Sequence, residues 1–216
     1  MFIGLVFDPH HLSSQKISSY RKRFDPKYLK GTHLQLTLLP PFSFPEEQKT
    51  KFYDFVQDLK DLFDGHLHGL SDFTNIEFHG IDFIAGKKSL VGLNPKLPID
   101  LVHCQEAVKD ILEEYGIEFK NPKSVQAFRE RQEKLGDRDS VSLKSFLTIG
   151  RFSYNDELES GLEIARDEFP HAFTLPLVDI CLFKNLPHQW VIESSLYKVQ
   201  RIAGSSEGHL LRWMEY

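Results

Sequence analysis

Cysteine is scarce in this chain, and long apolar segments are missing. The 216 residues include two cysteines, Cys104 and Cys181, each in an apolar stretch where a small buried side chain is the usual role. A disulfide framework is therefore not expected. No apolar run approaches the roughly 20 residues of a spanning helix. The run 1–7 is too short for a secretion signal and lacks its basic flank, so we expect a soluble, cytoplasmic protein.

The chain also has no surplus of positive charge. It contains 26 Lys and Arg against 31 Asp and Glu, which gives a net charge of −5. Broad attraction to a polyanion needs the opposite balance, so any contact with a nucleic acid should be local. No glycine-rich phosphate loop, nucleophile elbow or metal-ligand spacing of histidines is present. We expect neither a metal nor a cofactor.

Apolar periodicity predicts strands and helices in alternation. The clearest helical pattern follows 43–46 (SFPE), which has the form of a capping box. Strands are expected at 2–7, 33–39, 75–84, 89–93, 142–152, 173–183 and 189–199, and helices after 14, after 46, over about 99–115 and after 155.

The order of these elements predicts an α+β fold with internal duplication, since each half has a strand, a capped helix and then a hairpin. With 41% hydrophobic residues, the chain 1–216 can form a single domain of two similar lobes. Residues 123–139 carry nine charged side chains in seventeen, which predicts a polar flap or insertion. The stretch 200–216 has mixed polarity and is not assigned, and the oligomeric state is not indicated.

Two of the predicted strands share a short pattern, QLTL at 35–38 and FLTI at 146–149. Side chains at positions i and i+2 of a strand point to the same face. The first segment therefore directs Gln35 and Thr37 into one space, and the second does the same with Phe146 and Thr148.

This pair of segments resembles the paired H-x-T motifs of the 2H phosphoesterase superfamily, which includes the 2′-5′ RNA ligase-like proteins and cyclic nucleotide phosphodiesterases. The segment 20–26 (YRKRFDP), the continuation of the second motif as FLTIGR, and a closing hairpin with Trp190 add to the resemblance. It implies a bilobal duplicated fold in which two antiparallel sheets line a central groove and the helices lie outside.

The resemblance also implies roles for the motif residues. Thr37 and Thr148 match the hydroxyls that bind phosphate in the family. Gln35 and Phe146 occupy the positions of the two histidines that act as general acid and base. An amide does not exchange a proton near neutral pH and a phenyl ring has none to give, so whether the chain is an enzyme is left open.

Three cationic residues near the motifs are further candidates. His33 and Lys144 come two residues before Gln35 and Phe146, on the same face of each predicted strand. At about 3.3 Å per residue, each lies about 7 Å along the strand from the motif residue. His33 is the candidate for a relocated proton-transfer group, and Lys144 could help to hold an anion. Both could equally be solvent-exposed ends of strands. Arg151 could contact phosphate if the strand bulges at Gly150, or could form a structural ion pair.

Three hypotheses follow for the function. The first is a binding module with a degenerate active site, which holds a nucleotide or an RNA-end phosphate without histidine-based catalysis. The second is an active phosphodiesterase on 2′,5′-linked or 2′,3′-cyclic phosphates that uses other groups such as His33. The third is a non-catalytic scaffold whose groove is filled by side chains such as Phe146 and which works through a protein surface. No membrane partner is expected.

Overall fold

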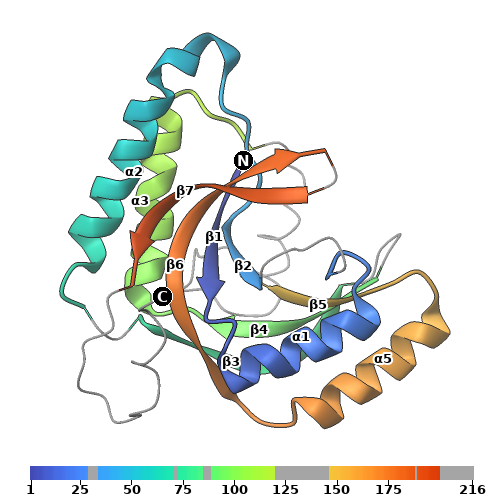
Figure 1. Cartoon of the computed structure of the whole chain (residues 1–216). Coiled ribbons are helices and arrows are strands. Elements are labelled where there is room, and N and C mark those ends of the chain that lie inside the picture. The colour runs from blue at the N-terminus through green and yellow to red at the C-terminus, as the bar shows by residue number, and fades with distance from the viewer. Residues whose placement is uncertain (29–33, 71–72, 85–88, 120–145, 188, 200–216) are drawn as a thin grey trace, which may run out of the picture.

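The computed structural model describes residues 1–28, 34–70, 73–84, 89–119, 146–187 and 189–199 (Figure 1). The predicted flap at 123–139 and the stretch 200–216 lie outside the described residues. The prediction of an α+β fold is confirmed. The strands are β1 (Phe2–Phe7), β2 (Gln35–Leu39), β3 (Asn75–Ile84), β4 (Ser89–Lys96), β5 (Leu147–Phe152), β6 (Phe173–Leu186) and β7 (Gln189–Lys198), and the helices are α1 (Leu12–Phe24), the 3₁₀ helix η2 (Glu46–Lys51), α2 (Phe52–Leu67), α3 (Ile99–Glu114) and α5 (Asn155–Glu168).

Within the described ranges, seven strands form one antiparallel sheet. Six of them follow the order β2-β1-β6-β3-β4-β5, and β7 lies outside this order and pairs with residues 179–186 of β6. The fourteen residues of β6 make this continuity possible. Residues 173–176 pair with β3, while 177–183 pair with β1. The strands predicted to form two sheets therefore belong to one sheet with β6 in common.

The order of strands has a symmetry that follows the chain. Exchanging β1, β2 and β3 with β4, β5 and β6 turns the order β2-β1-β6-β3-β4-β5 into the same order read from its other end. The two strands with the threonine patterns, β2 and β5, are the two ends of this order. The sheet curves so that these ends approach one another (Figure 1).

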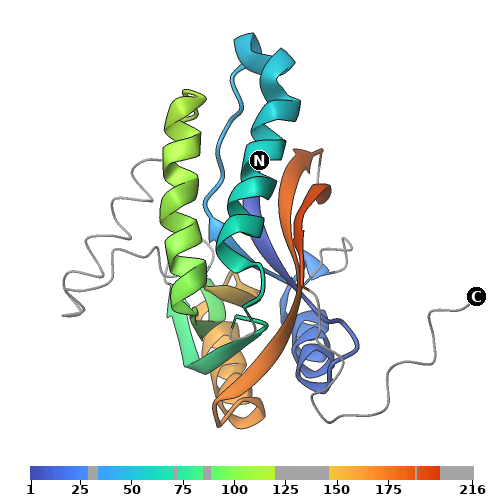
Figure 2. The ribbon, with the colours of Figure 1, turned by 90° about the vertical axis from the view of Figure 1, so that its left-hand side faces the viewer.

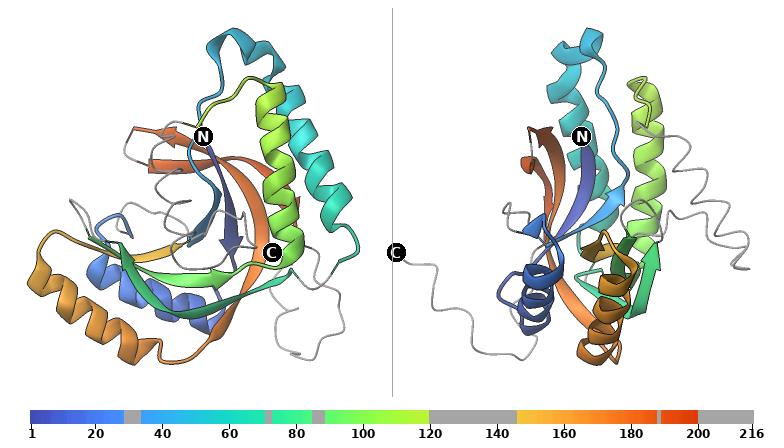
Figure 3. Two further views of the ribbon diagram at one scale, coloured as in Figure 1. Left: turned by 180° about the vertical axis from the view of Figure 1, so that it is seen from behind. Right: turned by 90° about the vertical axis from the view of Figure 1, so that its right-hand side faces the viewer.

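The helices form two pairs on the outside of the sheet. α2 and α3 pack against one another (Figure 2), and α2 also contacts β7. α2 buries Phe55, Leu59 and Phe63 on the single stripe that their spacing predicts. α1 and α5 lie side by side (Figure 3), α1 against β5 and β6 and α5 against β3, β4 and β5.

One buried apolar cluster joins both halves of the chain. β1 is buried on both faces, in keeping with its unbroken apolar sequence FIGLVF. Tyr20 of α1 belongs to this cluster, and its hydroxyl donates to the carbonyl of Gly161 in α5 at 2.7 Å. Cys104 and Cys181 are buried free thiols, as predicted. None of the described helices is long and apolar enough to cross a bilayer.

The predicted capping box at 43–46 is wrong. Pro45, not Ser43, is the N-cap residue, and it caps η2 rather than the α-helix, which begins at Phe52. Phe42 is fully buried and bridged to Phe119, while Phe44 packs against the rings of Phe52 and Phe55. This packing holds residues 42–44 in an extended path, so tertiary contacts determine where the helix starts.

Two helical glycines provide a test of this packing, because alanine should have opposite effects at them. A Cβ at Gly65 in α2 would meet nothing within 4 Å, so Gly65→Ala should raise the free energy of unfolding by about 1 kcal/mol through helix propensity. A Cβ at Gly161 in α5 would lie 2.3 Å from the Phe152 ring, so Gly161→Ala should lower it by about 1–3 kcal/mol.

Urea unfolding of the two variants beside the wild type measures both changes. A stabilised Gly161→Ala protein would contradict the close packing of α5 on Phe152.

Candidate functional site

A pocket of about 170 Å³ lies where the two ends of the sheet meet. β2 contributes two residues to its wall and β5 another two, and the end of α1 and the turn after it supply the cationic side. The pocket is lined by Phe2, Arg21, Lys27, Gln35, Thr37, Pro41, Phe146, Thr148, Arg151 and Trp190.

The structure brings the four motif residues together in this pocket. Gln35 and Thr37 line the pocket from β2. Thr148 lines it from β5, and Phe146 lines it from the position just before β5. Thr37 is exposed and Thr148 is half-buried, so a molecule in the pocket can reach both hydroxyls.

The two threonines occupy the same position in their strand pairs. Thr37 lies opposite Gly4 of β1, and Thr148 lies opposite Gly92 of β4. In both pairs the register shifts at the next residue: Ile3 pairs with Leu39 and Val91 with Gly150. One residue after each threonine, Leu38 or Ile149, is therefore left over in a β-bulge.

The bulge in β5 explains how Arg151 reaches the pocket. Thr148 and Arg151 are three residues apart and would face opposite sides of a regular strand. The extra residue, Ile149, reverses the alternation, so both side chains line the pocket. In β2 the carbonyl of the extra residue, Leu38, accepts a hydrogen bond from Nε2 of Gln105 in α3 at 2.6 Å.

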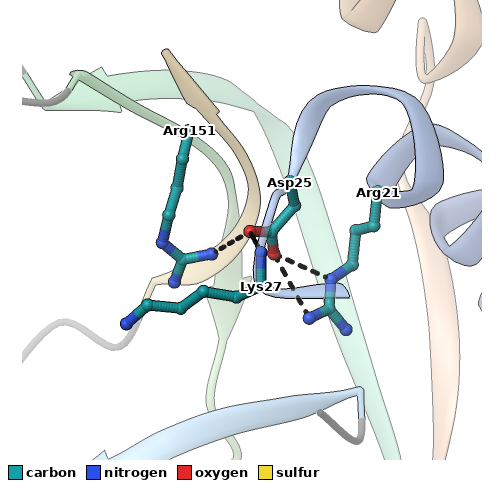
Figure 4. Close-up of polar contacts among 4 residues, drawn as sticks. All are labelled: Arg21, Asp25, Lys27 and Arg151. Atoms are coloured by element: carbon teal, nitrogen blue, oxygen red, sulfur yellow. Dashed lines mark hydrogen bonds and ion pairs between the residues drawn. The ribbon is translucent and has the colours of Figure 1, made fainter. Parts of the chain in front are cut away.

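A buried carboxylate, Asp25, connects the arginines of the two elements that flank the pocket (Figure 4). Arg151 donates from Nη1 to its Oδ1 at 2.5 Å. Arg21 donates from Nε and Nη2 to its Oδ2, each at 3.3 Å. The backbone N–H of Lys27 donates to Oδ1 at 3.0 Å. The side chain of Asp25 is 0% exposed, so water screens these ion pairs less than it screens pairs on the surface.

Local sequence places Asp25 at this point. It is the C-cap residue of α1, and its N–H donates to the carbonyl of Arg21. Pro26 follows with the fixed φ that suits a turn, and the bond from Lys27 N–H to the Asp25 carboxylate closes an Asx-turn. Burial lowers the pKa of Arg21, and the neighbouring carboxylate of Asp25 opposes that change.

Aromatic rings form another side of the pocket. The ring of Phe2 stacks on Phe183 with centroids 4.6 Å apart and meets the edge of Trp190 at 4.7 Å. Phe146 lies over Gly92, where a Cβ would come within 2.3 Å of its ring. Phe146 thus packs against β4 at one wall and leaves the pocket open.

The remaining sequence candidates and the pocket residues overlap only in part. His33 and Lys144 lie outside the described residues. Sequence reasoning did not select Asp25, Arg21 or Lys27 as site residues, because the basic residues at the end of α1 also suit the negative end of the helix dipole. The available signal was the spacing of Arg21 and Asp25, four residues apart on one helix face and just before a proline.

The pocket has the chemistry of an anion site. Its described walls offer two hydroxyls, one amide, two guanidinium groups and one ammonium group, and they contain no imidazole, carboxyl or thiol. Such groups hold a phosphate by hydrogen bonds and charge. They provide no acid–base pair that titrates near neutral pH.

A scan against models of protein families finds no match for this chain, and a search of curated proteins finds no relative.

The ion pairs of Asp25 should matter for stability as well as for the site. Replacing it by Asn keeps the shape and leaves the two guanidinium groups without their counter-charge, which should lower the free energy of unfolding by about 3 kcal/mol. Urea denaturation measures the change. The matched control is Asp61→Asn on the exposed face of α2, expected to stay within about 0.5 kcal/mol of the wild type. Equal effects of the two changes would contradict the account.

Proposed function

We propose that this protein binds the phosphate of a nucleotide or of an RNA end, in a 2H phosphoesterase-like site that has lost proton transfer. One observation carries the proposal: Thr37 and Thr148 line the same pocket, and Arg21, Lys27 and Arg151 line it with them. Hydroxyl and guanidinium donors that converge from different elements are the groups that recognise phosphate oxygens.

The equivalence of the two strand pairs supports the duplicated fold that the proposed 2H phosphoesterase-like site requires. The sequences IGL at 3–5 and VGL at 91–93 each pair with an L-T-x segment in the same register and with the same bulge. Exchanging the two halves also gives the same order of strands, read from its other end. A common ancestor of the two halves accounts for both features, and it matches the bilobal duplicated arrangement that the resemblance implies.

The residues beside the threonines favour binding over catalysis. Gln35 can donate and accept hydrogen bonds, and Phe146 can do neither. A general acid or base contributes roughly 10²–10⁴ in rate, so a site without both retains little of the family mechanism, even when the effects are not additive.

The aromatic side of the pocket favours a nucleotide over a bare anion. Trp190 is half-buried, packs on Phe2 and lines the same pocket as the cationic residues, so it presents apolar surface next to the phosphate donors. A base or ribose of a bound nucleotide can pack there while the phosphate meets Thr37 and Thr148.

Isothermal titration with 2′-AMP and with 2′,3′-cyclic AMP tests the proposal. We expect the wild type to bind at least one of them without converting it, because hydrogen bonds to charged groups are retained and proton transfer is absent. Thr37→Val and Thr148→Val should each weaken binding about tenfold, the loss of one hydrogen bond to a charged group.

Thr174→Val is the matched control, since Thr174 is exposed on β6 and does not line the pocket. Absence of heat at millimolar concentrations of both nucleotides would remove the proposal. Turnover of the cyclic nucleotide would show that other groups supply proton transfer.

A further inference from the structure

The two arginines of the pocket wall are bonded to Asp25 through different parts of their guanidinium groups. Arg21 uses the edge formed by Nε and Nη2, from which each nitrogen donates to Oδ2 at 3.3 Å. Arg151 donates to Oδ1 through Nη1 at 2.5 Å, so this bond does not involve its Nε–Nη2 edge. Figure 4 shows the two guanidinium groups on opposite sides of the carboxylate.

The Nε–Nη2 edge is the part of an arginine that best fits a phosphate. Its two N–H groups point the same way and can donate to two oxygens of one carboxylate or phosphate. In Arg21 this edge is directed at Asp25. The side chain of Arg151 is 22% exposed against 7% for Arg21. A molecule in the pocket therefore reaches the edge of Arg151 more readily than that of Arg21.

The carboxylate that holds Arg151 is itself fixed by the backbone. Asp25 is the C-cap residue of α1, and the N–H of Lys27 donates to its Oδ1 at 3.0 Å. Arg21, one turn earlier on the same helix, holds its other oxygen. A long arginine side chain has many rotamers in the absence of such a partner. Asp25 thus offers Arg151 one acceptor at one place beside the pocket.

We propose that Arg151 is the guanidinium that binds the phosphate, and that Asp25, held in turn by Arg21, is the positioning residue that presents it. The inference rests on the proposed function and divides the roles within that site. Because of the bulge in β5, Arg151 and Thr148 line the pocket from the same strand. The ligand then receives a hydroxyl and the edge of a guanidinium from β5, while Arg21 acts on it through Asp25.

The sign of one change in affinity separates positioning from simple electrostatics. Asp25→Asn removes a negative charge next to an anion site, and by charge alone this should strengthen the binding of an anion. If Asp25 positions Arg151, the same change should instead weaken binding of 2′-AMP about tenfold, the loss of about one hydrogen bond to a charged group. Isothermal titration of the full chain measures the change, at a temperature at which circular dichroism shows the variant to be folded. Asp61→Asn, on the exposed face of α2, should bind as the wild type does.

A double-mutant cycle tests whether Asp25 acts through Arg151. Arg151→Met removes the guanidinium and keeps a side chain of similar reach, so it should weaken binding of 2′-AMP at least about tenfold. Adding Asp25→Asn to this variant should then cause less than about a twofold further loss, whereas independent effects would multiply to about a hundredfold. Arg166→Met, on the exposed face of α5, is the control and should leave the affinity unchanged.

NMR spectra of the ¹⁵N-labelled wild type provide a second measurement, which does not depend on folding of the Asp25→Asn variant. The Nε–H signals of the two arginines are assigned by their loss in Arg151→Met and in Arg21→Lys. Addition of 2′-AMP should move the Nε–H signal of Arg151 more than that of Arg21, because the phosphate meets the edge that contains it. A larger shift for Arg21 would overturn the proposed division of roles.

The outcomes separate the inference from the proposed function. Unchanged or tighter binding of 2′-AMP by Asp25→Asn would overturn the positioning role, and so would losses that multiply in the double variant. Binding that survives Arg151→Met undiminished would overturn the role of Arg151 and leave phosphate binding by the other pocket groups intact. Failure of the wild type to bind 2′-AMP or 2′,3′-cyclic AMP would remove the proposed function and the inference together.

Discussion

The pocket depends on the pair of ion bridges that Asp25 makes inside the protein. This carboxylate joins the end of α1, through Arg21, to the strand β5, through Arg151. Because the carboxylate is shielded from water, the attraction is strong, and removal of the negative charge alone would leave two guanidinium groups close together. The same interaction joins both arginines at the pocket wall, so the stability of the fold and the proposed recognition of phosphate depend on one buried group.

The curved sheet supplies the second half of the site. β2 and β5 lie at opposite ends of the strand order, and the long strand β6 connects the two halves in between. Equivalent bulges follow Thr37 and Thr148 and turn each strand at the pocket. A hydroxyl from each half thus reaches the same space as the cationic groups. A chain of net charge −5 can in this way form a local anion site without attracting polyanions over its whole surface.

Much of this arrangement could be predicted from the sequence, because periodicity and alternation are local. The strand pattern places Gln35 with Thr37 and Phe146 with Thr148 on shared faces, and the structure has all four in one pocket. Long-range pairing was not accessible in the same way. The single sheet depends on how far β6 extends, and the start of α2 depends on where aromatic rings pack rather than on the capping signal.

The spacing of Arg21 and Asp25 is a local signal for one of the two ion pairs. The second pair could not be predicted from the sequence, since Arg151 is 126 residues from Asp25 and faces it because of a bulge. A crystal structure of the protein soaked with 2′-AMP tests the central claim most directly. The account predicts the phosphate between the hydroxyls of Thr37 and Thr148 and in contact with the guanidinium of Arg151. A phosphate bound elsewhere, or threonine hydroxyls turned toward separate cores, would contradict it.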